Sequence, residues 1–440
     1  MNRVPLADQN AAGPAGRVAV VLYGYAVGVS PSVINAATAL ARAGYGVDIF
    51  TYGTYIGDVT FPGLKVRIVE VAAKEAAVRG IGHFFLRIKH RLGRLLPTAW
   101  QVRLEQRSVE RNIRSYVAAV CSSMSDVARY TCLIGVEPLG LAVAHGVAAR
   151  EKAPLVYYNL ELYHEPDIRT VKDRVAIALE RLCNRDAVFT ITLDQQRAKI
   201  ISEQNGVPMG SIVTVPVSAD GDPFRDKTDY LRERLGLAQD DRIILYAGFL
   251  ADWAYCKEMA EAARQWPDNW VLVLHTHGFH DPAYVRKVRQ AEGRNVRFSM
   301  TPVPYDDLPA FLASAEIGVA LYKDLGANFN LIGSASGKLA HYLKSGLPVI
   351  VNSYPHIARV VEKYGCGVAI DGPGNMADAI QTILDNYESM RDGAFRCYEE
   401  NYRFSRHFIK VIERIEHLRS VGRGSLPTGR MHPGWRIPEC

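Results

Sequence analysis

The sequence lacks the usual features of metal-binding, disulfide-linked and secreted proteins. Its 440 residues contain seven cysteines, an odd number, and no two of them form a CxxC pair; they are Cys121, Cys132, Cys183, Cys256, Cys366, Cys397 and Cys440. We therefore expect a reducing compartment and neither a metal nor a disulfide framework. The first sixteen residues contain no apolar segment of the kind that a secretory signal needs, which predicts a cytoplasmic protein.

Long apolar runs and a large excess of one charge are also missing. The strongest candidate for a membrane span, residues 132–149, is interrupted by Glu137, Pro138 and His145, so it predicts a strand followed by a helix. The formal net charge of +6 is too mild to indicate nucleic acid by itself. It is compatible with an anionic small ligand or an anionic membrane surface.

The composition, 48% hydrophobic and 22% charged, is that of an ordinary globular protein, and the length suits two domains. From Arg17 an apolar strand, a glycine-containing turn, a helix and a second apolar strand form a βαβ unit. Apolar runs of this kind recur to residue 217 and, after the polar stretch 218–229, again from 242 to 371. Because most of the runs are apolar throughout, they predict parallel strands covered on both faces.

We therefore predict an α/β protein with two tandem doubly wound, Rossmann-like domains. The domains are assigned to residues 17–220 and 230–395, a terminal helix to 396–419, and flexible tails to 1–16 and 420–440. Ligands of this class bind in a cleft at the carboxyl ends of the strands, so an interdomain cleft is expected.

The stretch NLIGSASGK, residues 330–338, runs into a predicted helix that starts near Ser336. Ser336 can cap that helix, while Gly333 and Gly337 let an anion approach the backbone. Lys338 lies in the first turn, where the helix dipole disfavours a cation unless an anion neutralises it. The stretch therefore predicts a diphosphate site; the alternative is a serine cap beside a solvent-exposed lysine. It is not a Walker A loop, because Leu339 follows the lysine.

With this loop and the passage GLPVIVNSYPHIARVVEKYGCGVAID that follows it, the chain resembles the GT-B glycosyltransferases over about residues 17–415. The group it resembles is family 4, of the bacterial surface-polysaccharide type. The resemblance implies transfer of a sugar from a nucleotide-sugar donor to a glycan or lipid-linked acceptor. It places donor contacts mainly in the C-terminal domain and acceptor contacts in the N-terminal one. It implies no metal and no cofactor, since protein dipoles and cations hold the leaving diphosphate.

The resemblance and the residue types together assign the donor site to Gly248, His277, Val303, Tyr305, Gly333, Ser334, Ser336, Gly337 and Lys338. Two departures from the family pattern accompany this assignment. Ile332 and Ala340 stand where the family commonly has two glutamates, and Phe249 and Ala254 stand where many members have an arginine and a lysine. Lys338 would then neutralise charge on the leaving group without those partners, which makes it a candidate catalytic residue.

Candidate acceptor and catalytic residues follow strand ends in the N-terminal domain. Glu137 and Glu161 each come directly after a predicted strand, and a carboxylate there could deprotonate an acceptor hydroxyl. Gly24 and Gly28 belong to the loop that in the resembling family faces the donor phosphates and the acceptor. The alternatives are that each glutamate caps a helix or binds a backbone N–H, and that the glycine loop is a structural turn.

The segment Arg79–Trp100 carries five basic residues and no acid, interleaved with leucine, phenylalanine and tryptophan. This mixture suits a helix that lies on an anionic membrane at the inner face of the cell membrane. The alternative is a core-facing helix with a solvated basic side. No nucleic-acid recognition module accompanies the charge, so no nucleic-acid partner is expected.

Two other functions are compatible with the same architecture. A sugar-nucleotide 2-epimerase would need several acids and histidines that converge on the cleft, and no convincing set is present. A catalytically degenerate scaffold protein would fit the missing glutamates but not the retained glycine, serine and lysine loop. The sugar, the nucleotide, the acceptor, the stereochemistry and the oligomeric state are not specified by the sequence.

Overall fold

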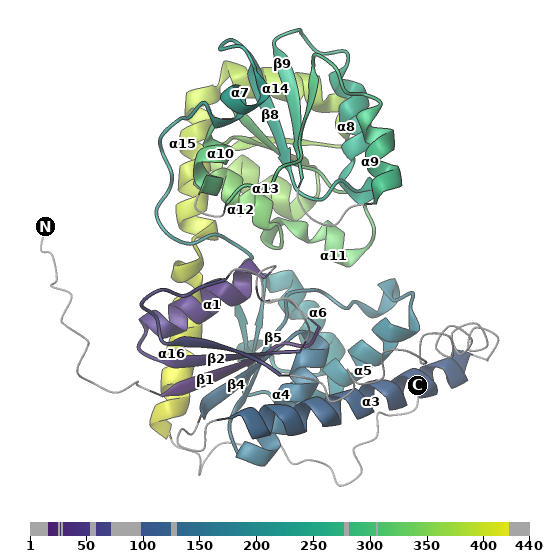
Figure 1. Ribbon diagram of the computed structural model, residues 1–440, viewed down its shortest axis with the longest axis vertical. Helices are drawn as coiled ribbons and strands as arrows, with labels where there is room; N and C mark the ends of the chain where they lie inside the picture. The colour runs from purple at the N-terminus through teal and green to yellow at the C-terminus, as the bar shows by residue number, and fades with distance from the viewer. Residues whose placement is uncertain are drawn as a thin grey trace, which may run out of the picture. The chain divides into compact units, whose positions relative to one another are not determined.

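The computed structural model describes residues 16–24, 27, 30–52, 59–71, 98–124, 130–276, 281–304 and 307–421 (Figure 1). The chain divides into two compact units, of which unit 1 comprises Met1–Val215 and His407–Cys440 and unit 2 comprises Pro216–Arg406. The division after Val215 lies a few residues before the boundary expected from the sequence. The C-terminal helical residues from His407 onward belong to unit 1.

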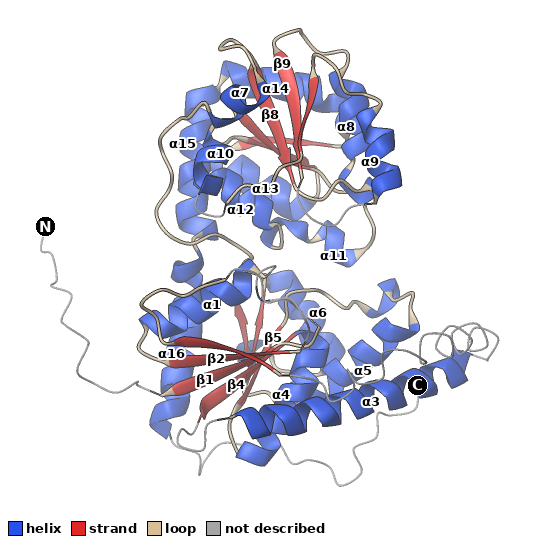
Figure 2. Cartoon of the chain, viewed as in Figure 1, coloured by secondary structure: helices blue, strands red, loops and turns tan. Residues whose placement is uncertain are grey.

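Unit 1 is built on a seven-stranded parallel sheet with the strand order β3-β2-β1-β4-β5-β6-β7. Its strands are β1 (Arg17–Val21), β2 (Gly46–Thr51), β3 (Val66–Glu70), β4 (Tyr130–Val136), β5 (Leu155–Tyr158), β6 (Phe189–Thr192) and β7 (Ile212–Thr214). The helices are α1 (Pro31–Arg42), α3 (Thr98–Ser123), α4 (Glu137–Glu151), α5 (Val171–Asn184), α6 (Gln195–Asn205) and α16 (Phe404–Val421). Helices cover both faces of the sheet (Figure 2), as its mostly apolar strands predict.

Two glycines let α4 lie unusually close to the sheet. A Cβ atom on Gly140 would lie 2.7 Å from the carbonyl oxygen of Val21 in β1, and one on Gly135 would lie 2.5 Å from the Cα atom of Leu141. Only glycine fits at such approaches. The start of α4 is thereby fixed between the carboxyl ends of β1 and β4.

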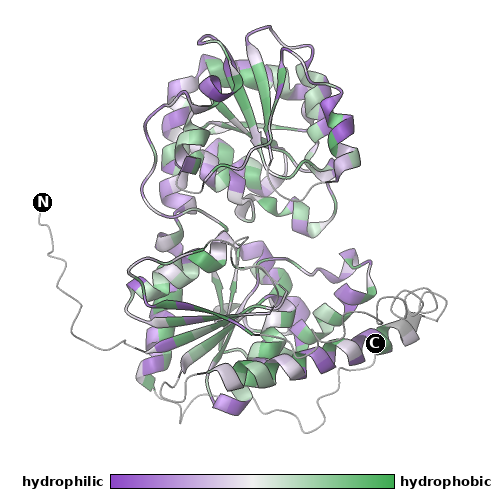
Figure 3. Ribbon diagram, viewed as in Figure 1, coloured by the Kyte–Doolittle hydropathy of each residue, from purple (hydrophilic) through white to green (hydrophobic). Residues whose placement is uncertain are grey.

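Unit 2 has a six-stranded parallel sheet with the order β10-β9-β8-β11-β12-β13. Its strands are β8 (Arg242–Ala247), β9 (Trp270–His275), β10 (Val296–Ser299), β11 (Ile317–Ala320), β12 (Val349–Asn352) and β13 (Gly367–Ile370). The helices are α7 (Tyr230–Leu235), α8 (Cys256–Ala263), α9 (Pro282–Arg289), α10 (Leu308–Ala313), α11 (Ala327–Asn330), α12 (Gly337–Lys344), α13 (Pro355–Tyr364), α14 (Met376–Asp385) and α15 (Tyr387–Cys397). The strands of both sheets are predominantly hydrophobic (Figure 3).

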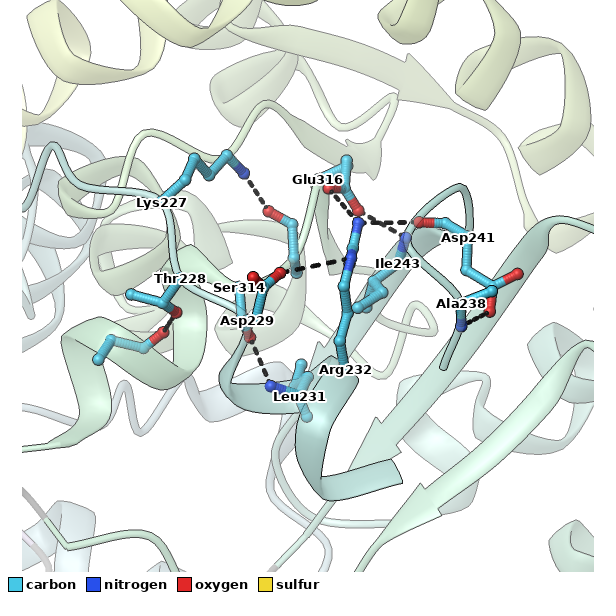
Figure 4. Close-up of polar contacts among 12 residues, drawn as sticks. Lys227, Thr228, Asp229, Leu231, Arg232, Ala238, Asp241, Ile243, Ser314 and Glu316 are labelled. Carbon is cyan, nitrogen blue, oxygen red and sulfur yellow. Dashed lines mark hydrogen bonds and ion pairs between the residues drawn. The ribbon is translucent and has the colours of Figure 1, made fainter. Parts of the chain in front are cut away.

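A buried ion pair fixes the amino end of the unit 2 sheet (Figure 4). Arg232 of α7 donates to Glu316, at 3.0 Å, and to the carbonyl oxygen of Asp241, at 2.9 Å. The other carboxylate oxygen of Glu316 accepts the backbone N–H of Ile243 in β8, at 2.7 Å. Because the two charges are paired and most of their polar atoms are hydrogen-bonded, they can remain buried, and they hold α7 against β8 and β11.

The residues assigned from the sequence to a terminal helix, 396–419, are almost all helical but are divided among three segments. Helix α15 ends at Cys397, a π-helical segment covers Tyr398–Tyr402, and α16 begins at Phe404. Two tyrosines of the π-helical segment donate to backbone carbonyls elsewhere in unit 2: Tyr398 to Gly221, at 2.8 Å, and Tyr402 to Gly333, at 2.9 Å. Since π-bulges re-aim side chains within a helix, these contacts account for the break.

Three further findings concern the described part of the chain. None of its helices combines the length and the apolar character that a bilayer-spanning helix needs. No group of three or more histidine, cysteine, aspartate or glutamate side chains within it is arranged to hold a metal ion. Its six cysteines are all free thiols.

Candidate functional site

Each sheet has a switch point, where the strand order reverses and loops on either side diverge. In unit 2 this point lies between β8 and β11, and in unit 1 it lies between β1 and β4. Ligands of doubly wound proteins bind at the carboxyl ends of such neighbouring strands. Gly248 and Tyr322 follow β8 and β11, and Tyr23 and Glu137 follow β1 and β4. The two switch points are therefore the candidate sites.

The start of α12 is where the sequence predicts it. Ser336 is the N-cap residue, and its hydroxyl oxygen accepts the backbone N–H of Leu339 at 3.3 Å. The hydroxyl also lies 2.6 Å from that of Tyr322. The N–H groups of Gly337 and Lys338 lie in the first helical turn, where they have no partner within the helix. The helix therefore presents donor groups and partial positive charge at this end.

Lys338 is neither exposed to solvent nor paired with an anion. Its Nζ atom is buried and has no hydrogen-bond partner among the described residues. It lies 4.1 Å from the ring centre of Tyr246, 5.0 Å from that of Tyr322 and 5.9 Å from that of Trp253. We call these three residues the aromatic cage. A Cβ atom on Gly248 would lie 3.0 Å from the same Nζ atom, so the absence of a side chain there makes room for the ammonium group.

The position of Lys338 is energetically unfavourable for a cation. Burial lowers the pKa of its ammonium group from 10.5 to about 8. The helix dipole also disfavours a positive charge in the first turn. The aromatic rings offset part of this cost through cation–π attraction. A buried cation with these properties, next to a helix N-terminus, is the kind of group that an incoming anion stabilises.

The other residues assigned to the donor site have different surroundings. Gly333 is buried, its carbonyl accepts from Tyr402, and a Cβ atom on it would lie 3.3 Å from Ile357. The carbonyl of Ser334 accepts the backbone N–H of Val217 at 2.8 Å. These contacts show packing and loop-anchoring roles.

Val303 is half-buried and packs against the core of unit 2. His277 and Tyr305 lie outside the described residues. The donor-binding roles of Val303, His277 and Tyr305 stay predictions, as do those of Gly333 and Ser334.

In unit 1, Glu137 occupies a strained position at the turn from β4 into α4. Its backbone φ of 61° lies in the left-handed region, which is uncommon for a residue other than glycine. Its Oε1 atom accepts the backbone N–H groups of Leu160 and Glu161, at 2.7 and 2.9 Å. The alternative role of binding backbone N–H groups is therefore realised by one carboxyl oxygen. The other, Oε2, is buried with no hydrogen-bond partner in the described ranges.

The surroundings of Glu137 suit proton transfer. Burial raises the pKa of its carboxyl group to about 8, although the N–H groups of Glu161 and Leu160 act in the opposite direction. A group with a pKa near the working pH can both accept and return a proton. Glu161 itself is exposed, and its negative charge acts in the same direction as burial on the pKa of Glu137. Arg197, fully buried, interacts electrostatically with both of them and with Asp194.

Three tyrosines surround the carboxyl ends of β1 and β2. Tyr23 and Tyr52 stack with ring centres 5.3 Å apart, and Tyr116 of α3 lies 4.9 Å from Tyr52. Gly24 follows with a φ of 67°, and a Cβ atom there would meet nothing within 4 Å, so its backbone conformation rather than space requires glycine. Gly28 lies outside the described residues.

Several site residues were not identified from the sequence. The aromatic cage was missed because Tyr246 and Tyr322 meet Lys338 only after β8 and β11 pair. The sequence signal that could have indicated the cage is a tyrosine near the end of each predicted strand, Tyr246 in β8 and Tyr322 just after β11. Arg197 was missed because an arginine in an ordinary helix pattern gives no sign of full burial. The predicted membrane segment Arg79–Trp100 lies outside the described residues, except for its last three, which begin α3.

Comparison with known proteins gives a family match in unit 2. Residues 263–400 match the family model described as the glucosyltransferase 3-like C-terminal domain. That range includes α12, Lys338 and Tyr322 but not Tyr246, Gly248 or Trp253. A search of curated protein sequences finds no match to the chain.

Solved structures resemble the whole chain. Sucrose-phosphate synthase from Thermosynechococcus elongatus has a TM-score of 0.67 at 16% identity, with 92% of this chain and 100% of that chain covered. HepE from Anabaena, in complex with UDP and glucose, has a TM-score of 0.62 at 14% identity, with 91% and 100% covered. WaaG, a glycosyltransferase involved in lipopolysaccharide biosynthesis, has a TM-score of 0.58 at 14% identity, with 91% and 99% covered.

These likenesses confirm the predicted fold class, two doubly wound α/β units of the GT-B type. The family match over residues 263–400 supports the prediction of a glycosyltransferase. Neither finding supports the epimerase or scaffold alternatives. The interdomain cleft and the roles of individual residues stay predictions.

Proposed function

We propose that the protein is a glycosyltransferase that moves a sugar from a nucleotide-sugar donor to a glycan or lipid-linked acceptor. The observation that carries the proposal is the buried Lys338 ammonium group, unpaired among the described residues, at the N-terminus of α12. A diphosphate would supply the negative charge that this group and the helix end lack. The family match over residues 263–400 supports the same reading.

The donor in this proposal is a uridine diphosphate sugar. The Anabaena protein HepE, whose fold this chain shares, has been solved with UDP and with UDP-glucose. The leaving diphosphate would accept the N–H groups of Gly337 and Lys338. Because the Lys338 Nζ atom lies inside the aromatic cage, phosphate contact requires its side chain to rotate toward the ligand. Gly248 leaves the space beside Nζ in which this rotation begins.

We further propose that the reaction uses no metal ion and no cofactor. The helix N-terminus and the ammonium group provide the positive charge that a divalent cation provides in other nucleotide-dependent enzymes. Lys338 has three N–H donors and a flexible stem, so it can follow charge as it develops on the leaving oxygen. Activity that persists in a chelator would support this part of the proposal, and loss of activity that Mg²⁺ or Mn²⁺ restores would contradict it.

Glu137 is the proposed general base that receives the proton of the acceptor hydroxyl. Its Oε1 atom is fixed by two backbone N–H groups, which leaves Oε2 to accept a hydrogen bond. Glu161 is exposed beside it and would orient the acceptor through hydrogen bonds to hydroxyl groups. The stacked pair of Tyr23 and Tyr52 offers an aromatic surface of the kind on which sugar rings pack.

The proposed setting is the cytoplasm, at the inner face of the cell membrane, in polysaccharide or glycolipid assembly. The free thiols of the described cysteines fit a reducing compartment. A lipid-linked acceptor would require the enzyme to reach a bilayer, and the basic, apolar segment Arg79–Trp100 supports such contact by its composition.

A thermal-shift panel of nucleoside diphosphates and nucleotide sugars tests the proposal. We expect UDP to raise the melting temperature of the wild type and to have no effect on Lys338→Met. Lys344→Met is the matched control on the same helix, because it removes the same charge at the opposite end, and it should keep the response. UDP release from a UDP-sugar that depends on added acceptor identifies a transferase. Formation of a 2-epimerised nucleotide sugar without acceptor, or no change in melting temperature with any nucleotide tested, would contradict the proposal.

A further inference from the structure

One face of α3 carries both basic and apolar side chains, and these residues are exposed. The residues of this face, which we call the α3 outer face, are Trp100, Arg103, Leu104, Arg107, Arg111 and Arg114, and all are exposed. Successive members lie three, four or one residue apart, which places them along one side of a helix. The arginines alone span about 16 Å along the helix axis.

The opposite face of α3 attaches it firmly to unit 1. Val102, Ile113, Tyr116, Val117 and Val120 are all buried in the core that α3 shares with α4 and α5. Figure 1 shows α3 beside α4 along one side of the sheet. The hydroxyl of Tyr116 donates to the carbonyl oxygen of Leu22, at 2.9 Å. The outer face is therefore a fixed feature of the unit and not a frayed segment.

The charge on the α3 outer face is positive. The acids of α3 lie beside it: Glu105 and Glu110 are partly buried, and Glu110 pairs with Arg114, at 3.3 Å. Arg107 and Arg111 are exposed and lie one turn apart between Arg103 and Arg114. A row of arginines with this spacing attracts a surface of dense negative charge rather than one anionic group.

The apolar members of the face decide which kind of anionic surface fits. Trp100 is 56% exposed and Leu104 is 49% exposed, and the two lie one turn apart at the amino end of the helix. A soluble polyanion would leave both in water. The boundary between lipid headgroups and acyl chains accepts a tryptophan and a leucine while its phosphates pair with arginines.

We propose that the α3 outer face docks on an anionic lipid bilayer. Arg107 and Arg111 pair with lipid phosphates, and Arg103 and Arg114 add positive charge on either side of them. Trp100 and Leu104 enter the interfacial layer. The proposal rests on α3 alone and depends neither on the donor site in unit 2 nor on the residues before Thr98. It assigns the contact to a described surface, whereas the composition of Arg79–Trp100 suggests contact without locating it.

Flotation of the full chain with lipid vesicles tests the proposal. Phosphatidylcholine vesicles serve as the neutral surface, and vesicles with about one third phosphatidylglycerol serve as the anionic one. We expect binding to the anionic vesicles that weakens between about 0.05 and about 0.5 M salt, because screening shortens the reach of the arginines. Equal binding to the two kinds of vesicle, or none to either, would overturn the proposal.

Charge-matched variants separate the α3 outer face from net charge. Arg107→Gln with Arg111→Gln should weaken binding about thirty-fold, at about fivefold for each arginine. Arg286→Gln with Lys287→Gln removes the same charge from exposed positions on α9 of unit 2, and it should change binding less than twofold. An equal loss in the two variants would mean that net charge alone drives binding and would refute the assignment.

The apolar part of the face needs its own pair of variants. Trp100→Ser with Leu104→Ser should weaken binding about tenfold and leave the salt dependence in place. The control, Leu325→Ser with Ile409→Ser, removes exposed apolar side chains elsewhere and should have little effect. Single-stranded DNA that binds the face more tightly than anionic vesicles do would identify a soluble polyanion as the occupant, and the bilayer proposal would be wrong.

Discussion

Replacing Lys338 by methionine should stabilise the ligand-free protein while it abolishes donor binding. The two side chains have similar length, so the aromatic cage stays filled and the buried charge is removed. The difference between a pKa of 10.5 and one of about 8 corresponds to about 3 kcal/mol against the charged form in the folded state. Cation–π attraction from the aromatic cage offsets about 1 kcal/mol of this cost. We therefore expect Lys338→Met to raise the free energy of unfolding at pH 7 by about 2 kcal/mol.

The sign of the pH dependence follows from the lowered pKa of Lys338. Below pH 8 the lysine is protonated in both states, and the wild type bears the full cost of burying the charge. Between about pH 8 and 10.5 the unfolded chain binds more protons than the folded one, so the wild type gains stability relative to the variant. The gap between wild type and Lys338→Met should be largest at pH 7 and should shrink toward pH 10.

Urea unfolding of both proteins at several pH values measures this gap, because other titrations cancel in the difference. Lys344→Met supplies the contrast: its Nζ atom donates to the carbonyl of Asp220 at 2.5 Å, so its removal should destabilise the protein by about 1 kcal/mol. If Lys338→Met proved less stable than the wild type at pH 7, or the gap were independent of pH, the buried unpaired ammonium group would not exist in solution.

Three other substitutions have expected outcomes that follow from single contacts. Gly140→Ala places a Cβ atom 2.7 Å from the backbone oxygen of Val21 and should destabilise by about 2 kcal/mol, seen as a lower melting temperature. Glu137→Gln removes a carboxyl group whose pKa of about 8 exceeds the ordinary 4.5. Between pH 4.5 and 8 the free energy of unfolding of the wild type should therefore fall by about 4 kcal/mol relative to that of the variant, as measured by urea unfolding. Gly248→Ala brings a Cβ atom within 3.0 Å of the Lys338 ammonium group and should weaken UDP binding about tenfold in calorimetry with the fold intact. A normal melting temperature for Gly140→Ala would contradict the first prediction. A pH-independent difference in the free energy of unfolding for Glu137→Gln would contradict the second, and an unchanged affinity of Gly248→Ala for UDP would contradict the third.

The parts of the fold that depend on local pattern were predictable. Runs such as RVAVV at Arg17 and VIVN at Val349 are mostly apolar because helices cover both faces of the sheets, and they form β1 and β12. The start of α12 was predictable because Ser336 is a good N-cap and glycine and lysine follow it. These features are set by residues that are neighbours in the chain.

Features set by distant parts of the chain were not predictable. The aromatic cage forms because β8 and β11 are adjacent in the sheet, and nothing in the segment around Trp253 indicates that its ring lies near Lys338. The left-handed conformation of Glu137 occurs where α4 begins close to β1, and the local sequence GVEPLG indicates neither feature. The break between α15 and α16 depends on tyrosine hydrogen bonds to carbonyls elsewhere in unit 2.

Proton uptake on UDP binding is the most direct test of the claim that Lys338 meets the donor diphosphate. Calorimetric titrations at pH 8 in two buffers with different ionisation enthalpies measure the number of protons taken up. A pKa that returns from about 8 toward 10.5 in the complex corresponds to about half a proton taken up by the wild type, and Lys338→Met should give no binding heat. UDP binding without proton uptake, or equal uptake in the two proteins, would contradict the account.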